Sequence, residues 1–574
     1  MRFFNVGMSL LTMVPVLTAL STHTHAFPVE TLERFNFLQN DPSPDSISGT
    51  TPITLFNYWR DILTGFFTEI DSKPSVPDVY LYGGIRSVFN LNETIDEEFN
   101  QWLNEQADVS FHRILQNIGG VGILDSSVAP GAVIASPSKE NPNYFYQWVR
   151  DAAITVNSLT EYLQDNGPEY NSDISKNLFL AIESYIANNY KLQRLDNKSG
   201  TWESLDGLGE PKFMADSTTF DDHWGRPQRD GPGLRVIAIT NYINFLLDNS
   251  MDFSHPELLT NMKHVYENII KPDLTYIMMN WNENGFDLWE EVDSIHLFTA
   301  LTMLKALKAG IKVSNHFDDK DFGLKLRLSF TALRMYILLE SGFKNSEIPY
   351  LIETPSLILQ GKRCGLDIAS ILATLRAHDM DDPTDFIDIP FSVDDSAVLS
   401  TLAALVGDMK FRYPINHQNG SFSKGFALGR YPEDLYDGLG ISEGNPWFIS
   451  TATASELLYK MIYFLYDRNE DLVISREQLP FFSTFINIDP NTTAQKIIMP
   501  YGSQAFIDTT LSLMQYADSF LEVIRQHVDA DGHMSEQFNR YTGYMEGAKD
   551  LTWSYGSFWS AVRWRMRADT ALSV

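Results

Sequence analysis

Helical periodicity recurs about twelve times along this chain, and it constrains the fold more than any other feature. Some segments are amphipathic: residues 254–270 carry an apolar stripe behind a capping box made by Ser254 and Glu257. Others, such as Leu234–Leu247, are apolar nearly all round, which is typical of a helix buried on every side. Both kinds occur in similar number, and no strand-helix alternation of the kind a parallel sheet needs is found. We therefore predict an all-α fold of two concentric helix rings, with helices near 98–118, 148–164, 174–190, 233–247, 256–280, 292–309, 321–341, 366–378, 393–411, 448–466, 506–528 and 550–567.

The first residues have the pattern of a secretory signal peptide, residues 1–26. Arg2 precedes the apolar stretch Met8–Leu20, and a small residue, Ala26, closes it. Residues 27–97 are rich in Pro and Thr, contain short candidate strands such as Val79–Gly83, and form an N-terminal extension without an assigned role. Residues 98–574 form the helical domain. We expect a protein of the secretory pathway, outside the cell or in the vacuole or spore wall, with no membrane anchor after cleavage.

Composition limits the partners. With 74 Asp plus Glu against 43 Lys plus Arg, the formal charge is −31, which repels nucleic acid and anionic membranes. The 11 Trp, 25 Tyr and 37 Phe, beside so many carboxylates, suit the faces and hydroxyls of sugars. A lone Cys364 excludes an intrachain disulfide, and no metal-binding, phosphate-binding or serine-nucleophile motif occurs. We expect a monomer with no metal and no cofactor, and glycosylation candidates at Asn92, Asn197, Asn419 and Asn491.

Two acidic stretches are candidates for catalysis. Residues 284–294 place Asp287, Glu290 and Glu291 beside Trp289, where an indole and adjacent carboxylates can drive pKa values apart. An acidic helix N-terminus is the simpler interpretation of that stretch. The second candidate is Glu536, a loop residue that would ordinarily be solvated. Hydrolysis of a glycosidic bond needs two carboxylates on opposite sides of the bond, and spacing in the sequence does not establish that these two meet.

Three further loops combine an aromatic residue with Arg and Asp. They are residues 143–151, 224–231 and 429–434. Each one alone is explained equally well by an Arg–Asp pair that orients a loop. Three such clusters beside two candidate acids favour a saccharide site.

These segments, in this order, resemble the fungal and yeast glucoamylases, glycoside hydrolase family fifteen, and most of all the sporulation-associated yeast type. The resemblance runs from about Phe99 to Trp564. It rests on PGAVIASPSKENPNYFYQWVRDAA at 130–153, LGEPKF at 208–213, WGRPQRDGPGLR at 224–235, GFDLWEEV at 285–292, GRYPEDLY at 429–436, EGNPWF at 443–448, MSEQFNRYTGY at 534–544 and DLTWSY at 550–555.

The resemblance implies an (α/α)6 barrel for residues 98–574 and an α-glucan substrate. It implies release of β-D-glucose from the non-reducing ends of starch, glycogen and maltooligosaccharides by an inverting mechanism. The family's general acid falls on Glu290 and its base on Glu536, while Asp287 belongs to the active-site signature and is a weaker candidate for the base. Inversion predicts carboxyl groups about 6.5–9.5 Å apart. The family's substrate contacts fall on Tyr144, Trp148, Arg150, Asp151, Trp224, Leu288, Trp289, Glu291, Arg430, Asp434 and Trp553.

Two alternatives stay open at this point. The same barrel could act on another α-glucoside such as isomaltose or trehalose, or the chain could be a catalytically silent glycan-binding wall protein. Leu439–Ser442 are also inserted relative to the shorter filamentous-fungal loop, which affects the wall of the site near Tyr436.

Overall fold

The computed structural model describes residues 78–88, 97–123, 125–169, 172–253, 261–419, 425–489 and 494–573. All of them belong to one compact unit, Val76–Val574. The predicted signal peptide, most of the predicted extension, and the sequons at Asn92 and Asn491 lie outside the described residues, as does the side chain of Asn419.

Six inner helices of the described chain form a closed ring. Each contacts the next in order, and the last contacts the first. The second and the fifth have sequences that are apolar on nearly all sides, and almost every residue of the fifth is buried. The inner helices are α5 (Val149–Asn166), α7 (Asp230–Asp248), α10 (Leu297–His316), α13 (Ala369–Ala377), α16 (Phe448–Asp467) and α19 (Thr552–Leu572).

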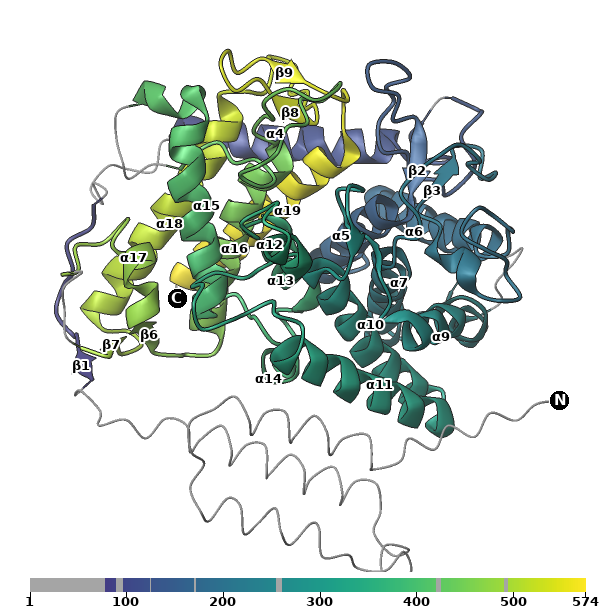
Figure 1. Cartoon of the computed structure of the whole chain (residues 1–574), viewed down its shortest axis with the longest axis horizontal. Helices are drawn as coiled ribbons and strands as arrows, with labels where there is room; N and C mark the ends of the chain where they lie inside the picture. The colour runs from purple at the N-terminus through teal and green to yellow at the C-terminus, as the bar shows by residue number, and fades with distance from the viewer. Residues whose placement is uncertain are drawn as a thin grey trace, which may run out of the picture. The chain divides into compact units, whose positions relative to one another are not determined.

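Outer helices alternate with the inner ones along the chain, and each contacts an inner neighbour. Figure 1 shows the pairs in chain order, from purple α4 through teal α10 and α11 to yellow α19, which returns beside α4. The outer elements are α4 (Glu97–Gln116), α6 (Ser172–Leu192), the run α8 (Met262–Val265), η4 (Tyr266–Ile270) and α9 (Lys271–Asn280), α11 (Lys320–Leu339), α15 (Ser396–Arg412) and α18 (Gln504–Arg525). This arrangement is an (α/α)6 barrel, and it confirms the predicted fold.

Every predicted helix corresponds to a helix of the barrel, but two boundaries were wrong. The helix predicted over 256–280 begins at Met262 with Asn261 as its N-cap, and the predicted capping box of Ser254 and Glu257 lies outside the described residues. The helix predicted from residue 292 begins at Leu297, because residues before it form the hairpin of β4 (Gly285–Phe286) and β5 (Asp293–Ser294). The acidic stretch 287–291 therefore lies in the turn between these two strands, ahead of the helix. That turn carries Glu290.

Short elements occupy the loops. The strands form a sheet in the order β1 (Val79–Tyr80), β7 (Lys496–Met499), β6 (Leu472–Ser475), and two further pairs, β2 (Tyr146–Trp148) with β3 (Lys212–Met214) and β8 (Gln537–Phe538) with β9 (Met545–Glu546). The short helices are η3 (Asp206–Gly209), α12 (Pro355–Leu359), α14 (Asp385–Asp388), η5 (Pro414–Asn419), η6 (Arg476–Gln478) and α17 (Leu479–Phe482). None of the helices in the described ranges is both long and apolar enough to cross a bilayer.

Part of the predicted extension is attached to the barrel unit. Strand β1 pairs in parallel with β7, and the N–H of Leu81 donates to the carbonyl of Ile498 at 2.8 Å. The N–H of Ile85 donates to Asp508 of α18 at 3.0 Å. Residues 78–88 thus contact elements near the end of the chain, which the boundary predicted at residue 97 did not anticipate.

A buried ion pair joins inner helix α7 to outer helix α9. Arg235 donates from Nε to Asp273 Oδ2 at 2.7 Å and from Nη2 to Oδ1 at 2.6 Å, and both side chains are almost completely buried. A bidentate pair of this kind offsets the cost of removing two charges from water only while both partners are present.

We predict that Asp273→Ala lowers the free energy of unfolding by about 3–5 kcal/mol, because it leaves the Arg235 guanidinium buried without a counter-charge. Urea denaturation followed by circular dichroism measures this loss. The double variant Arg235→Met with Asp273→Ala should recover most of it. Equal losses in the single and double variants would show that packing, and not the unpaired charge, is responsible.

Candidate active site

The predicted site residues lie at one end of the barrel, where the inner helices begin. Trp148 is the residue before α5, Asp230 is the first residue of α7, Trp447 precedes α16 and Trp553 lies in the first turn of α19. The inner helices are packed side by side, so the loops that lead into them meet at one end. The positive ends of the helix dipoles also favour carboxylates at this end.

Glu290 is held by two N–H donors. The indole Nε1 of Trp148 donates to Glu290 Oε1 at 2.7 Å, and the amide Nε2 of Gln228 donates to the same oxygen at 2.8 Å. Arg150 Nη2 lies 3.7 Å from that oxygen. Because Oε1 only accepts hydrogen bonds here, a proton to be given away would reside on Oε2.

The loop that carries Glu290 is closed by Asp287. Its Oδ1 accepts the N–H of Glu291 at 2.7 Å and that of Val292 at 2.8 Å. His296 Nε2 lies 3.0 Å from the carbonyl oxygens of both Gly285 and Val292 and ties the two strands of the hairpin together. Glu290 itself has a φ of 66°, a conformation that costs free energy in a non-glycine residue. Asp287, predicted as a catalytic residue, therefore shapes this turn.

Glu536 lies in the loop before α19 and is 2% exposed. Its N–H donates to the carbonyl of Ala548 at 2.9 Å, and the Tyr436 hydroxyl donates to its Oε2 at 3.4 Å. Burial raises the pKa of Glu536 to about 8, although the positive charge of Arg430 opposes the rise. Gly547 makes room for the carboxylate: its φ is 73°, and a Cβ there would lie 2.3 Å from Glu536 Oε2.

Two tyrosines link the candidate acids. The hydroxyls of Tyr144 and Tyr436 lie 2.9 Å apart, and Tyr436 reaches Glu536. Burial and the negative charges of both Glu536 and Glu290 raise the pKa of Tyr144 well above its ordinary value. The Tyr144 ring also packs edge to face on Trp148, the donor to Glu290, with centroids 5.5 Å apart. Glu290 and Glu536, far apart in the sequence, are therefore connected through Tyr144, the first by way of Trp148 and the second by way of Tyr436.

Glu291 belongs to a network of cations. Arg430 Nη2 donates to its Oε1 at 2.8 Å, Arg363 Nη2 donates to its Oε2 at 2.7 Å, and the Tyr431 hydroxyl also donates to Oε2. Burial opposes ionisation of Glu291, but these neighbours hold its pKa below the ordinary value. Arg430 is fixed in turn by two bonds to Asp434, at 2.8 and 2.6 Å.

Aromatic rings surround these charges. Trp289 stacks on Trp553 with ring centroids 6.5 Å apart, and its Nε1 donates to Asp367 at 3.1 Å. Trp224 meets Trp148 edge to face at 6.0 Å. Leu288, between Asp287 and Trp289, is buried. Indole faces of this kind stack well on the apolar faces of pyranose rings.

Several polar atoms at the site have no hydrogen-bond partner among the described residues. They are Asp151 Oδ2, Arg150 Nε and Trp224 Nε1, all of which are buried. The first two face each other as an ion pair at 3.5 Å without forming a hydrogen bond. Burial raises the pKa of Asp151 to about 6, with Arg150 opposing and Glu290 adding to the rise. Buried polar atoms without a partner are costly, so these atoms are available to the hydroxyls of a bound ligand.

Sequence reasoning missed four contacts. Arg150 Nη1 donates to Gln228 Oε1 at 2.8 Å and to Asp230 Oδ2 at 3.0 Å. Both acceptors lie in the WGRPQRDG stretch, where polar residues at the start of an inner helix could have identified them. Tyr436 was named only in connection with the inserted loop. Asp367 has no motif, and only the tertiary contact with Trp289 identifies it.

The insertion Leu439–Ser442 leaves Tyr436 on the site. Asp437 closes the inserted turn by accepting the N–H groups of Leu439 and Gly440 at 3.0 and 2.7 Å. The apolar side chains of Leu439 and Ile441 are exposed. The extra residues thus loop outward, while the Tyr436 ring stays against Trp447 at 6.2 Å.

Asn197 is the one predicted glycosylation site with a described side chain. Its Nδ2 donates to the carbonyls of Gly207 at 2.9 Å and Leu195 at 3.2 Å, and its Oδ1 accepts the N–H of Ser199 at 2.9 Å. A glycan on Nδ2 would replace one of the two donated protons. Glycosylation of Asn197 therefore competes with the local turn and remains a prediction.

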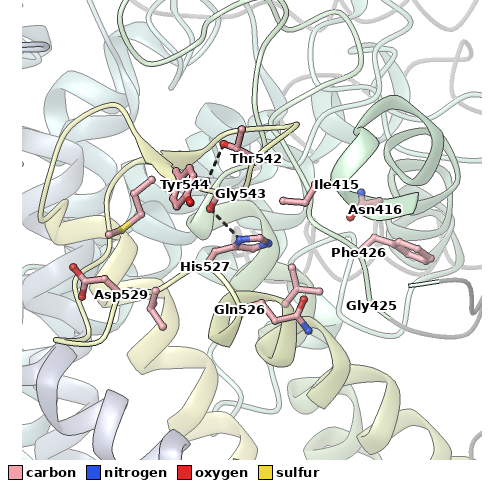
Figure 2. A pocket seen from close by; sticks show the side chains of 13 residues that line it. Ile415, Asn416, Gly425, Phe426, Gln526, His527, Asp529, Thr542, Gly543 and Tyr544 are labelled. Atoms are coloured by element: carbon pink, nitrogen blue, oxygen red, sulfur yellow. Dashed lines mark hydrogen bonds between the residues drawn. The ribbon is translucent and has the colours of Figure 1, made fainter. Parts of the chain in front are cut away.

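A cavity of about 470 Å³ lies beside the β8–β9 hairpin, which follows Glu536. Figure 2 shows His527 in this cavity, with its Nδ1 bonded to Gly543. The imidazole stacks on Phe538 of β8 with centroids 4.3 Å apart. None of the predicted site residues lines the cavity, which lies against one side of the hairpin. Among the described residues, no group of three or more His, Cys, Asp or Glu could hold a metal ion.

Two buried carboxyl groups behind Trp289, those of Asp367 and Glu353, make the stability of the fold depend on pH. Burial raises the pKa of Asp367 to about 7, and burial with the charge of Asp367 raises that of Glu353 well above its ordinary value. A raised carboxyl pKa means that the folded state binds the proton more tightly than the unfolded state. The stabilising effect of this bound proton is complete below pH 3.8, the ordinary pKa of an Asp carboxyl, and is lost as the pH rises towards 7.

We predict that Asp367→Asn makes the free energy of unfolding less dependent on pH between about pH 4 and 7, by up to ~1.4 kcal/mol per pH unit. The Asn oxygen can still accept from Trp289 Nε1 and from the N–H of Ala369. Urea unfolding at a series of pH values measures the slope. Asp531→Asn, on the exposed surface, is the control. Equal slopes in wild type and Asp367→Asn would contradict the prediction.

Comparisons with known proteins identify the family. The model of the family described as Glycosyl hydrolases family 15 matches residues 109–563. A glucoamylase of Saccharomycopsis fibuligera is 39% identical over 486 residues, 82% of this chain and 90% of that protein. The intracellular sporulation-specific glucoamylase of Saccharomyces cerevisiae is 37% identical over 537 residues, 90% of this chain and 94% of that protein.

Solved structures of glucoamylases superpose on this chain. The atomic-resolution structure of glucoamylase from Saccharomycopsis fibuligera superposes with a TM-score of 0.76 at 38% identity, covering 85% of this chain and 98% of that chain. The family 15 glucoamylase from Hypocrea jecorina gives a TM-score of 0.69 at 29% identity, covering 82% and 72%. The barrel, the paired carboxylates and these likenesses together place the chain in glycosyl hydrolase family 15, as a glucan-acting glycoside hydrolase of the glucoamylase type.

Proposed function

We propose that this protein is an inverting glucan 1,4-α-glucosidase that releases β-D-glucose from the non-reducing ends of starch, glycogen and maltooligosaccharides. The observation that carries the proposal is the arrangement of Glu290 and Glu536 about Tyr144, one with a fixed oxygen and the other deeply buried. A binding protein has no need of both acids.

The proposed reaction uses the two carboxylates once each. Glu290 gives its proton, from Oε2, to the glycosidic oxygen as the bond to C1 breaks. Glu536 takes a proton from a water that attacks C1 from the opposite face, so the C1–O bond forms with inversion. The leaving oxygen becomes the hydroxyl of the shortened glucan. After the step Glu290 is ionised and Glu536 is protonated, and exchange with solvent restores the starting state.

Burial opposes this role for Glu536 in one respect. A base must be ionised, yet burial raises its pKa to about 8. Hydrogen bonds from the attacking water to the carboxylate favour the ionised form, as the Tyr436 hydroxyl already does. Since the raised pKa of Glu536 would also suit a proton donor, the role of each carboxylate is tested separately below.

Binding of the terminal glucose is assigned to charged groups around the acids. Arg150 Nε and Asp151 Oδ2 form an ion pair at 3.5 Å and have no hydrogen-bond partner, and Arg430 and Glu291 form a fixed ion pair at 2.8 Å. Fixed charged groups of this kind bind vicinal hydroxyls with little loss of side-chain entropy. Trp289, Trp553 and Trp224 supply the ring faces.

The substrate is tested by glucose release from maltoheptaose, isomaltose and trehalose. We expect the highest kcat/KM for maltoheptaose, and β-glucose as the first anomer seen by polarimetry or NMR. Release of α-glucose would exclude inversion. Preference for isomaltose or trehalose would establish the rival α-glucosidase, and no release from any of the three would favour the silent binding protein.

The acid and the base are separated by leaving group. Glu290→Gln keeps the shape but removes the proton donor, so kcat/KM for maltose should fall at least ~10²-fold. An activated aryl α-glucoside needs little protonation and should be affected less. Glu536→Gln should slow both substrates equally, because water then lacks its base. The exposed Glu140→Gln is the control and should resemble wild type. If instead the aryl α-glucoside were spared in Glu536→Gln and not in Glu290→Gln, Glu536 would be the acid and Glu290 the base.

Export and assembly form a smaller proposal. The apolar stretch Met8–Leu20 and the small residue Ala26 support cleavage before Phe27, and no membrane-spanning helix is found in the described residues. We expect a secreted or vacuolar glycoprotein that is a monomer. N-terminal sequencing of the mature protein would give Phe27 as its first residue, and light scattering would give one chain per particle.

A further inference from the structure

A buried lysine lies directly across a strand pair from the donor to Glu290. Strands β2 and β3 are antiparallel, and Lys212 is the cross-strand partner of Trp148. Lys212 is 2% exposed. The register of two short strands therefore fixes the backbone of this lysine relative to the indole that binds Glu290 Oε1 at 2.7 Å.

The Lys212 ammonium is surrounded by aromatic faces. Its Nζ lies 3.5 Å from the ring centroid of Trp224, 4.1 Å from Tyr146, 4.2 Å from Phe220 and 4.4 Å from Trp148. Among the described residues, no carboxylate oxygen comes within 4 Å of it. A buried ammonium normally requires a partner, and here the ring quadrupoles take that place. We call these four rings the aromatic cage.

The cage is built so that several faces converge. Trp148 meets Tyr146 at 88° and Trp224 at 62°, and Phe220 meets Trp224 at 89°. Edge-to-face packing of this kind leaves ring faces free to point at a common centre. The ammonium at that centre contacts all four rings, so the orientation of the Trp148 indole depends on it.

The charges around the cage also involve the acid. Burial lowers the pKa of Lys212 to about 8, while Glu290 and Asp222 raise it and Arg226 lowers it further. Arg226 is itself paired with Glu210 at 2.7 Å. Below pH 7 the lysine is therefore mostly charged. A cation over an indole face polarises the ring and strengthens its N–H as a donor.

We propose that Lys212 is a positioning residue for Glu290: the caged ammonium orients the Trp148 indole, whose N–H holds Oε1 and leaves Oε2 directed at the glycosidic oxygen. This inference rests on the proposed role of Glu290 as the general acid. Lys212 touches neither substrate nor reacting atoms, and it acts through Trp148.

A purely structural lysine would behave differently. Replacing a buried charge that lacks a counter-ion with an apolar side chain of similar length is often neutral or stabilising. Lys212→Met keeps the length and packing of the side chain and removes the charge. Stability and positioning are thereby separated in one variant.

For Lys212→Met we expect a thermal unfolding midpoint equal to or above that of wild type. The kcat for maltose should fall by about 10–100-fold, with KM changed by less than about threefold, because misplacing the acid affects the transition state more than binding. The activated aryl α-glucoside should lose less than about threefold in kcat, because its leaving group needs little protonation. Lys212→Arg, which keeps the charge, should retain more activity than Lys212→Met.

The matched control is Lys139→Met. Lys139 also lies over a ring, 4.1 Å from the Phe145 centroid, but it is largely exposed and forms a pair with Asp125. Its loss should leave both substrates at wild-type rates. In a Trp148→Phe background, which removes the indole N–H, Lys212→Met should cause little further loss, since the two changes act on one contact.

Three results would overturn the inference: wild-type kcat in Lys212→Met, an equal loss on both substrates, or additive losses in the double variant. A lowered midpoint with a matching loss of activity would assign Lys212 to stability. Failure of the proposed function is read separately, from Glu290→Gln. If that variant turns over maltose at the wild-type rate, Glu290 is not the acid, whatever Lys212 does.

Discussion

Burial of apolar side chains between six inner helices is the constraint on which the rest of the molecule depends. Helices α7, α10 and α16 are apolar nearly all round, so they are stable only when other helices cover every face. Closing the ring does this, and it brings the starts of the inner helices to one end of the barrel. The loops at that end can then carry strained or charged residues, because the scaffold beneath them is rigid.

The candidate site divides its carboxylates by environment. Arg430, Arg363 and Tyr431 surround Glu291 and lower its pKa, while burial outweighs the opposing charges of Arg430 and Arg363 and raises the pKa of Glu536 and Asp367. The pocket therefore contains fixed anions for binding next to carboxyls that hold protons into the neutral range.

Several neighbouring residues position Glu290. Asp287 closes its loop through two backbone N–H groups, Gln228 fixes one oxygen, and the aromatic cage orients the second donor, Trp148. The left-handed conformation of Glu290 is the local cost of aiming this side chain. The same bonds that impose the strain keep the carboxylate in one place.

The sequence by itself determined the helices and the loops that carry the site, because periodicity and motif composition are local properties. It placed Glu290, Glu536 and the Arg–Asp clusters in candidate loops, but spacing along the chain could not establish that they meet. Only the tertiary structure decided that Glu290 and Glu536 are connected through Tyr144, and that Asp287 bonds to backbone. It alone revealed Asp367 behind Trp289 and the four rings around Lys212. Contacts between distant segments depend on how the ring closes, and no local pattern records that closure.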